Sequence, residues 1–389
     1  MPTLARGREQ ELLVTPTPTA MVWFEPGARH QEVAVPGVRL DAGDVLVEVE
    51  LATVCGSDVH TVSGHRGSPT PTVLGHEQVG RVLAVGGEEV LASDGTPLRP
   101  GDRVVWTVTV SCGGCDRCGS GHPQKCRSLA KYGHERMTRG WELSGGFATH
   151  VQLRRGTGIV RVPEQLPAEL AAPAACSTAT AVAALDAASR VPLDGATVLV
   201  GGAGMIGLAV TAIATEAGAD VVVVDPDVDR RVMARRFGAE ATLDPSDDLA
   251  AELARRRLSE PLVAIEASGA PSSVRALLGA IGTGGILVLV GSVSPGPTVD
   301  LDPEAIVRGL LTVTGVHNYR VEHLERAIDY LAGVRGAPPF GELVSAEYPL
   351  AEVDAALEAA ASSGHVRVGV RPERPVRPER PGSGAGSGR

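Results

Sequence analysis

Aromatic residues are scarce in this chain of 389 residues, because Phe, Tyr and Trp together make up 3% of it. A core built mainly from aromatic side chains is therefore excluded. The hydrophobic content of 43% instead predicts a core rich in Ala, Val and Leu. The charged fraction of 21% is typical of a globular protein. Because the chain is too long for one ordinary core, we expect two domains.

Long hydrophobic runs are also absent from the pattern. Apolar segments such as Val221–Val224 and Ile286–Val290 are far shorter than the roughly 20 residues that cross a bilayer. The segment Ala5–Glu11 is polar, and no apolar stretch typical of a signal peptide follows it. We therefore expect a cytoplasmic protein with no membrane partner.

The chain has no excess of positive charge. Its formal net charge is −10 at pH 7, and its arginines are spread along the sequence rather than gathered in one patch. Nucleic acids and acidic membrane surfaces attract basic proteins. We therefore expect a small-molecule partner and no nucleic acid.

Six cysteines divide by spacing into two groups. In a reducing cytoplasm, cysteines bind metals more often than they form disulfides. One group forms a C-x2-C-x2-C-x7-C run, whose neighbouring glycines let the backbone fold around an ion. Four thiolates so spaced are typical of a closed structural zinc site; an iron–sulfur cluster is the alternative, although nothing else suggests electron transfer. The predicted ligands are Cys112, Cys115, Cys118 and Cys126.

The other two cysteines, Cys55 and Cys176, stand apart in the chain. With His76 they make a Cys2His set, which leaves a fourth position open for water or substrate. Zinc held in this way acts as a Lewis acid on an alcohol or carbonyl oxygen. Asp58 is suited to orient the His76 ring, and Glu77 could do the same or transiently bind the metal. Alone, Cys176 would more often be a core thiol, but the combination favours a metal site.

A glycine-rich segment follows a short apolar strand. Gly202, Gly204 and Gly207 form a G-x-G-x-x-G pattern that includes Met205 and Ile206, and a helix is expected to begin inside it. The first glycine permits a tight turn, the second lets the backbone approach a pyrophosphate, and the third lets helix and strand pack closely. The phosphates then face N–H groups at the helix N-terminus. The alternative is an unliganded turn of an α/β sheet.

Asp225 ends the next expected strand, 18 residues after Gly207. A carboxylate at this point can accept hydrogen bonds from the ribose hydroxyls of the adenosine, and it would repel a 2′-phosphate. No Arg follows immediately, although Arg230 is near and is a candidate cofactor contact. The sequence therefore favours NAD over NADP.

The order of expected elements indicates two kinds of structure. Residues 20 to about 160 are rich in strands, for example Val45–Leu51, Gln78–Val85 and Arg103–Thr109. From residue 196 the elements alternate, which predicts a parallel sheet with helices on both faces. The strands are expected at Thr197–Val200, Val221–Val224, Leu262–Glu266, Ile286–Val290 and Leu311–Gly315, and the helices at Ala175–Ala188, Met205–Ala217, Arg230–Phe237, Val321–Gly333 and Ala351–Ser362.

With these motifs the chain resembles the zinc-dependent medium-chain alcohol dehydrogenases, from about Val22 to Val370. The resemblance rests on Cys-Gly-Ser-Asp at Cys55, Gly-His-Glu at Gly75, the four-cysteine run, Cys176 and the nucleotide fingerprint, in that order. It implies an α/β fold with a GroES-like, β-rich catalytic domain and a Rossmann doubly wound parallel sheet. The expected limits are 1–165 for the catalytic domain with its zinc lobe at 112–126, 166–316 for the Rossmann domain, 317–370 for a return to the catalytic domain, and 371–389 for a disordered tail.

The resemblance also implies roles for single residues. Cys55, His76 and Cys176 match the ligands of the catalytic zinc, while Ser57 and His60 match the relay that moves the hydroxyl proton to solvent. The implied reaction interconverts an alcohol with an aldehyde or ketone by hydride transfer to or from NAD. Arg367 does not fit the usual spacing, so its contact with the cofactor phosphate is doubtful. The remaining cofactor contacts implied are Thr180 against the nicotinamide, and the backbone of Val290, Ser292, Val316 and His317 around the carboxamide.

The substrate is the least determined feature. Segments after Cys55, around Lys131 and near His317 resemble a branch associated with phosphonate metabolism, which implies a hydroxyalkylphosphonate held by Arg66, Lys131, His134 and Arg136. These four residues could equally be solvent-exposed. The alternatives are a polyol or threonine-type zinc dehydrogenase, and a cofactor-binding protein of the same fold without catalysis. The resemblance further implies a homodimer or homotetramer.

Overall fold

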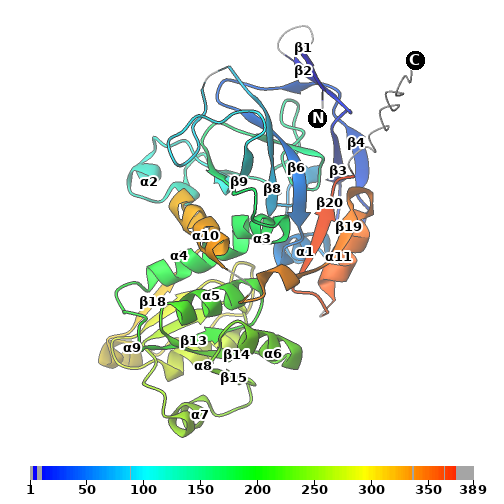
Figure 1. Cartoon of the computed structure of the whole chain (residues 1–389). Coiled ribbons are helices and arrows are strands. Elements are labelled where there is room, and N and C mark those ends of the chain that lie inside the picture. Colours follow the sequence, from blue (N-terminus) through cyan, green and yellow to red (C-terminus); the bar gives the residue numbers. More distant parts are fainter. Residues whose placement is uncertain (1–2, 7–10, 88, 335–336, 363, 374–389) are drawn as a thin grey trace, which may run out of the picture.

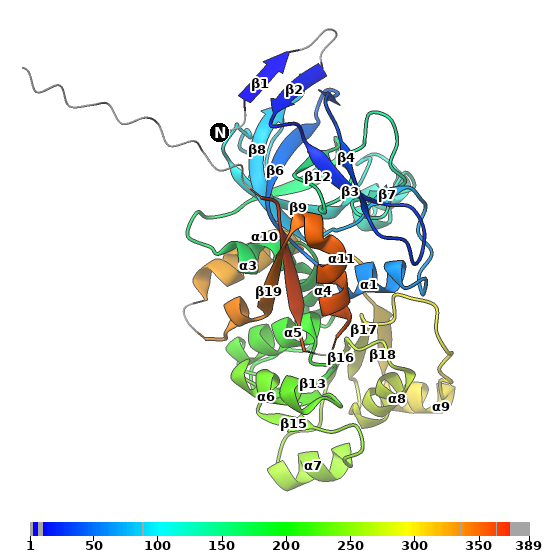
Figure 2. The same ribbon diagram turned by 90° about the vertical axis from the view of Figure 1, so that its right-hand side faces the viewer.

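The computed structural model describes residues 3–6, 11–87, 89–334, 337–362 and 364–373. A β-rich part lies above a part built on a parallel sheet in Figure 1, and helices lie where the two meet. The turned view in Figure 2 shows the same order of layers. The expected α/β fold with two kinds of sheet is confirmed.

The β-rich part is centred on an eight-stranded sheet with the order β10-β9-β8-β6-β20-β19, in which β11 also pairs with β6 and β12 with β9. These pairs are antiparallel, apart from β19 with β20. The strands are β6 (Val45–Thr53), β8 (Gln78–Val85), β9 (Arg103–Val110), β10 (Ala130–Lys131), β11 (His150–Leu153), β12 (Thr157–Arg161), β19 (Val344–Pro349) and β20 (Arg367–Arg371).

Two small sheets complete the β-rich part, with the orders β1-β2-β5 and β4-β3-β7. Despite the shortage of aromatics, Trp23 and Trp106 are among the largest fully buried side chains, and they pack in one core with many valines. The strands are β1 (Thr3–Arg6), β2 (Glu11–Thr15), β3 (Thr19–Trp23), β4 (Gln31–Ala34), β5 (Val38–Arg39) and β7 (Thr72–Val73). The short helices are α1 (Gly56–Val62), α2 (Asp116–Gly119), η2 (Pro123–Lys125), η4 (Phe340–Glu342) and η5 (Leu350–Glu352), and α11 (Val353–Ala361) follows η5.

The second part is a six-stranded parallel sheet with the order β15-β14-β13-β16-β17-β18. Its central strand β13 is buried at every position, as expected where helices cover both faces. The strands are β13 (Thr197–Gly201), β14 (Asp220–Val224), β15 (Ala241–Leu243), β16 (Val263–Glu266), β17 (Ile286–Leu289) and β18 (Thr312–Gly315). The helices are α5 (Met205–Glu216), α6 (Val228–Arg236), α7 (Leu249–Arg256), α8 (Pro271–Ala280) and α9 (Pro303–Gly309). The later helix α10 (Val321–Gly333) packs against α4 (Ala179–Ala187) and the strands β9 and β12 of the β-rich part.

The helix expected over Ala175–Ala188 begins earlier and is not uniform. It consists of α3 (Ala168–Pro173), a π-helical segment η3 (Ala174–Thr178) and α4 (Ala179–Ala187). This apolar run is longer than any that we identified from the sequence, and by length and hydropathy it could cross a membrane. Because 83% of it is buried inside the protein, it is a core helix. Single π-helical turns often occur at functional sites, and this one carries Cys176.

The tail was expected to begin at Arg371, and that limit is wrong. Arg371 is the last residue of β20, and its guanidinium pairs with Glu347 and Glu169 at 2.8 and 3.0 Å. Residues 374–389 lie outside the described residues. The expected elements Gln78–Val85 and Val321–Gly333 agree with β8 and α10 at both ends. The limits 165/166 and 316/317 between the domains stay a prediction.

Candidate active site

Three separate elements bring the predicted open metal site together. Cys55 immediately precedes α1, His76 immediately precedes Glu77 at the start of the β8 region, and Cys176 lies in η3. Their ligand atoms, with one carboxylate oxygen of Glu77, all lie within 4.8 Å of one another. Zinc binds sulfur at about 2.3 Å and imidazole nitrogen at about 2.0–2.1 Å. The donor set and its spacing therefore fit zinc.

The two ring nitrogens of His76 have different neighbours. Nδ1 lies 3.3 Å from Asp58 Oδ1, and Asp58 is completely buried. The second carboxylate oxygen of Asp58 accepts the Cys55 backbone N–H at 2.9 Å, so one carboxylate fixes two predicted ligands. Nε2 lies 3.3 Å from Ser57 Oγ. This arrangement leaves Nε2 as the nitrogen available to the metal and places Ser57 beside it.

Among the described contacts the Glu77 carboxylate hydrogen-bonds to groups other than His76, while its predicted transient binding of the metal stays a prediction, because one of its oxygens lies with the ligand atoms. It accepts Thr53 Oγ1 at 2.6 Å and forms an ion pair with Arg367 at 3.0 Å. Burial raises the pKa of Glu77 to about 7, against the lowering effect of the Arg367 charge. Orientation of His76 thus falls to Asp58, while Glu77 neutralises a buried arginine.

From the sequence, Arg367 was considered only as a contact of the cofactor phosphate, and its place beside Glu77 and Cys55 was not predicted. Its side chain is 11% exposed, and it donates to Ser177 Oγ at 2.8 Å and lies 3.8 Å from Cys55 Sγ. A hydrogen bond from Cys176 and the Arg367 charge hold the pKa of Cys55 well below its usual range, against the effect of burial. The spacing gave no signal because Arg367 comes from β20, more than 300 residues away from Cys55.

The four-cysteine run forms a second, separate cluster, and its four sulfurs also lie within 4.8 Å of one another. Cys115 Sγ is 3.5 Å from Cys118 Sγ and 3.9 Å from Cys126 Sγ. A tetrahedron of thiolates around zinc requires separations of roughly 3.8 Å. Neither α2 nor η2 in this lobe has a buried residue. The lobe therefore fits a closed zinc site that takes the place of a hydrophobic core.

The glycine fingerprint has the shape that a dinucleotide needs. Gly202 has a φ of +96°, which favours glycine. A Cβ on Gly207 would lie 1.8 Å from the Gly202 carbonyl oxygen, so helix α5 can approach only without a side chain there. A Cβ on Gly204 would meet nothing within 4 Å, which leaves that backbone open to a ligand. Met205 and Ile206 form the first turn of α5.

Asp225 lies in a cavity of about 560 Å³ lined also by Gly202, Gly204 and Arg230. The Asp225 carboxylate is nearly buried and accepts the Ala203 backbone N–H at 2.7 Å, so it supports the glycine turn as well. Neighbouring lining carboxylates include Asp227 and Asp244. This end of the site is thus rich in negative charge and fits an unphosphorylated ribose.

A second cavity of about 270 Å³ joins the predicted metal ligands to the parallel sheet. Most of the remaining predicted residues line it, and His60 is exposed. Ser292 and the exposed Arg136 are not among the described lining residues of this cavity, so the structure does not place them with the others. The predicted residues that it brings together are Ser57, His60, Arg66, Lys131, His134, Thr180, Val290, Val316 and His317.

This cavity is electropositive. Its described lining contains Arg66, Lys131 and Arg367 but no Asp or Glu. Burial, together with the charges of Arg66 and Lys125, lowers the pKa of Lys131 to about 8. Burial also lowers the pKa of His134 well below its usual range, helped by the nearby His76. Glu77 pairs with Arg367, whereas Arg66 and Lys131 form no ion pair among the described residues, and these two charges favour an anionic ligand.

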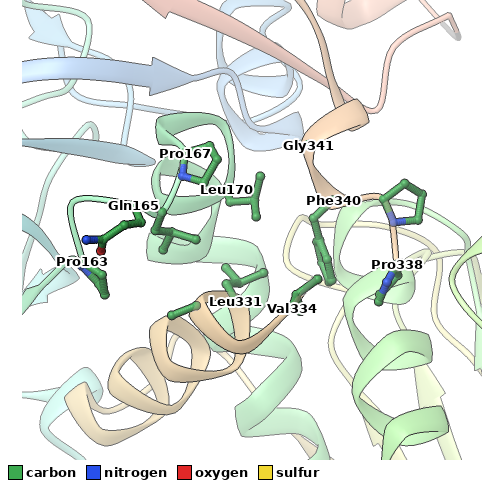
Figure 3. A pocket seen from close by; sticks show the side chains of 12 residues that line it. Pro163, Gln165, Pro167, Leu170, Leu331, Val334, Pro338, Phe340 and Gly341 are labelled. Atoms are coloured by element: carbon green, nitrogen blue, oxygen red, sulfur yellow. The ribbon is translucent and has the colours of Figure 1, made fainter. Parts of the chain in front are cut away.

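A further cavity of about 300 Å³ lies between the end of α10 and the turn at Phe340, as Figure 3 shows. Leu170, Leu331, Val334 and Phe340 line it, and Gln165 supplies the polar side chain. Its lining, among the residues that the structure describes, contains no acid, base or nucleophile. We therefore place the chemistry in the cavity lined by Cys55, His76 and Cys176.

Known proteins resemble the chain over most of its length. The model of the alcohol dehydrogenase GroES-like domain matches residues 41–164, and that of the zinc-binding dehydrogenases matches residues 206–333. An L-threonine 3-dehydrogenase from Anaeromyxobacter dehalogenans is 34% identical over 306 residues, which cover 76% of this chain and 80% of that protein. The chain belongs to the zinc-dependent medium-chain alcohol dehydrogenase family.

Other members of the family give the same result. A 5-exo-hydroxycamphor dehydrogenase from Pseudomonas putida is 29% identical, with 81% of this chain and 88% of that protein covered. An alcohol dehydrogenase from Thermotoga maritima superimposes with a TM-score of 0.84 at 29% identity, over 92% of this chain and all of that one. A zinc-binding dehydrogenase from Sinorhizobium meliloti bound to NADP has a TM-score of 0.78 at 28% identity, over 92% and 99% of the two chains. This dehydrogenase thus requires zinc and a nicotinamide cofactor.

Proposed function

We propose that this enzyme is a cytoplasmic, NAD-dependent zinc dehydrogenase that interconverts an alcohol carrying an anionic group with its aldehyde or ketone. The observation that supports it is the placement of the Cys2His set, the glycine turn and an electropositive lining around two cavities that share Gly204 and Ala267. When bound, zinc supplies a Lewis acid and the nicotinamide supplies a two-electron oxidant or reductant.

The side chains around the cavity bind the metal, transfer the substrate proton and position the cofactor. Cys55, His76 and Cys176 would hold the catalytic zinc. Ser57, beside His76 Nε2, is positioned to take the proton of the substrate hydroxyl. His60 is exposed and lines the same cavity, so it can return that proton to solvent. Thr180 lines the cavity, and its hydroxyl donates a hydrogen bond to the Cys176 carbonyl oxygen at 2.6 Å. This bond connects the proposed nicotinamide contact to a proposed zinc ligand.

NAD is the proposed cofactor, although a similar structure from Sinorhizobium meliloti holds NADP. Asp225 lines the adenosine end, and three further carboxylates, Asp227, Asp244 and Asp247, line the same cavity. Arg230 is the cation among the described lining residues, and the neighbouring Arg231 donates to the Asp225 carbonyl oxygen at 2.6 Å and to Asp244 at 2.9 Å, so carboxylates outnumber available cations at this end. A phosphate on the ribose would therefore meet negative charge.

The charge of the substrate follows from the lining. An amino alcohol such as threonine would bring an ammonium group, and the described lining has no carboxylate to receive it. Arg66 and Lys131 instead suit a carboxylate, phosphate or phosphonate. We propose a hydroxyalkylphosphonate as substrate, with a polyol or threonine as the alternatives.

The substrate proposal is tested by NADH formation with NAD and a panel of simple alcohols, polyols, threonine and 2-hydroxyethylphosphonate. We expect the phosphonate to give the highest kcat/KM. A preference for threonine would reject the anionic substrate but keep the reaction. No turnover of any alcohol would favour a protein of this fold without catalysis.

Zinc content tests the metal assignment separately. We expect two zinc ions per chain, one in each cluster, by elemental analysis. Cys176→Ser should lower the content to one, remove activity and leave the circular dichroism spectrum unchanged, because Cys176 belongs to the open set. A zinc content that stays at two would refute its assignment as a ligand.

A further inference from the structure

The two lysines of this chain meet at one imidazole. Lys and Arg together number 36, and only Lys125 and Lys131 are lysines. Lys125 Nζ lies 2.5 Å from His317 Nδ1, and Lys131 Nζ lies 3.4 Å from His317 Nε2. Lys125 ends η2 of the four-cysteine lobe, Lys131 belongs to β10, and His317 follows β18 of the parallel sheet. Three distant parts of the fold thus meet at one cluster of basic side chains. Hydride and proton transfer alone do not require such a cluster.

The hydrogen bonds of His317 cannot all be satisfied within this cluster. Partial burial and the charges of Lys131, Lys125 and Arg66 hold the pKa of His317 at about 4, so the ring is neutral at pH 7. A neutral imidazole has one acceptor nitrogen and one N–H donor. The shorter of the two lysine contacts, at 2.5 Å against 3.4 Å, favours Nδ1 as the acceptor from Lys125. Nε2 then carries the proton and faces the Lys131 ammonium, donor against donor.

Nothing nearby supplies the missing acceptor. Among the described residues, no Asp or Glu forms an ion pair with Arg66, Lys125 or Lys131. Glu135 uses its Oε1 to accept the backbone N–H of Lys131 at 3.0 Å. An uncharged Lys131 could accept the imidazole N–H, but its pKa of about 8 keeps it mostly protonated at pH 7. Glu135 and Cys176 offset the positive charge of Lys131 only in part, because its pKa stays below the usual range; a bound oxyanion would offset the remaining repulsion among Arg66, Lys125 and Lys131.

We propose that His317 Nε2–H, Lys131 and Arg66 bind the oxyanion of the substrate head group, and that Lys125 positions His317 by fixing its tautomer. All three binding residues line the cavity that holds the metal ligands, whereas Lys125 is not among its described lining residues. The inference rests on the proposed function for the alcohol to which the head group is attached. It gives the four-cysteine lobe a part in substrate recognition, because that lobe carries Lys125.

The binding experiment uses methylphosphonate, which has the head group but no hydroxyl. It is titrated calorimetrically at pH 7 into the zinc-loaded enzyme with NAD⁺, as wild type, Lys131→Gln and Arg139→Gln. Loss of one charge-assisted hydrogen bond should raise the Kd of Lys131→Gln on the order of 10- to 100-fold. Arg139 is exposed and not among the lining residues, so its variant should stay within about twofold of wild type. An equal Kd for wild type and Lys131→Gln would overturn the proposal.

Acetate identifies the kind of head group. A compact ammonium suits the oxygens of a tetrahedral anion, whereas a planar guanidinium also suits a carboxylate. Tighter binding of methylphosphonate than of acetate supports a tetrahedral head group, and equal binding supports a general oxyanion site. Binding of neither anion to the wild-type enzyme refutes the site.

The positioning role of Lys125 has its own test. Lys125→Gln should weaken methylphosphonate several-fold while zinc stays at two per chain, and Lys125→Arg should restore the affinity. Nitrogen-15 NMR of histidine-labelled enzyme should show His317 protonated at Nε2 in wild type and a mixture of tautomers in Lys125→Gln. An unchanged tautomer and affinity in Lys125→Gln would show that Lys125 has no such role.

The two proposals fail separately. Oxidation of neutral alcohols by NAD with no binding of methylphosphonate or acetate would keep the proposed function and refute the anion site. Binding of methylphosphonate that depends on Lys131, without turnover of any alcohol, would keep the anion site and refute the dehydrogenase activity.

Discussion

At the scale of single residues, cofactor choice depends on the charge of Asp225. Asp225→Asn removes that charge from the adenosine end and keeps an oxygen that can accept a backbone N–H. We expect the ratio of kcat/KM for NAD over NADP to fall by about 10-fold or more, because one repulsive charge near a phosphate is worth about 1–2 kcal/mol. Asp229→Asn, on the exposed face of α6, is the matched control. A ratio unchanged in both variants would contradict the assignment.

Lys131 predicts the pH dependence of substrate preference. Its pKa of about 8 means that the ammonium is present below pH 8 and lost as the pH rises further. The ratio of kcat/KM for 2-hydroxyethylphosphonate over 1-propanol should therefore be flat near pH 7 and decrease by roughly tenfold by pH 9. Enzyme groups that act on both substrates change both kcat/KM values equally, so their ionisation cancels in the ratio. A ratio that stays constant up to pH 9 would therefore exclude Lys131 as a ligand of the head group. The groups around Lys131 that shift its pKa are Arg66, Lys125, Cys176 and Glu135, and His317 contacts its Nζ.

Functional roles could be assigned from the sequence to residues that belong to a motif with strict spacing. They could not be assigned to residues that reach the site only through long-range folding. Cys55, His76 and Cys176 were selected because cysteine and histidine have few roles other than metal binding in such a combination. Arg367 was considered only as a phosphate contact, because one arginine among many has no spacing that indicates a place at the metal site. Its importance appears only when β20 places it between Glu77 and Cys55.

At the scale of elements, the four-cysteine lobe should depend on its metal. Neither α2 nor η2 contributes a buried residue, so thiolate–zinc bonds replace a core. Cys115→Ser should lower zinc content to one per chain and make the lobe sensitive to proteolysis between residues 112 and 126. Limited digestion with a mapped cleavage site measures this. Cys176→Ser, which empties the other site, is the control and should leave the lobe resistant; equal resistance of the Cys115→Ser lobe would contradict a structural zinc.

Elements with a clear hydrophobic pattern were also the ones predicted at the right limits. From Gly80 on, the strand β8 alternates between buried and partly exposed positions. The helix α10 has one buried face. The segment α3–η3–α4 has no such asymmetry, because positions 179–185 of α4 are all buried. An alanine-rich run without a polar face gives no sign of where it starts or where a π turn interrupts it. The short pair β19–β20 depends on β6 for its place in the sheet, and sequence patterns do not encode such distant pairing.

At the scale of the whole molecule, the reaction site exists only because the chain crosses between its two parts. The open metal site takes Cys55 from the β-rich part and Cys176 from the helix that leads to the parallel sheet. The anion cluster likewise takes Lys125 from the four-cysteine lobe and His317 from the sheet. A change in the relative position of the two parts therefore alters the metal site and the head-group site together. Closure of the two parts around a substrate would move the metal site and the head-group site together.

The last prediction concerns the free edge of the parallel sheet. The strand β18 ends the sheet and is only partly buried, and exposed apolar side chains flank it, with Val307 on α9 at 72% and Leu310 at 70% exposure. An unprotected edge with apolar neighbours favours pairing with a second copy of the chain. We expect a homodimer by analytical ultracentrifugation, and Val307→Glu should raise its dissociation constant by about 10-fold or more, because a charge is buried in the interface. Val228→Glu, on α6 beside the opposite edge strand and 60% exposed, is the matched control. Dissociation by Val228→Glu but not by Val307→Glu would place the interface at β15 instead.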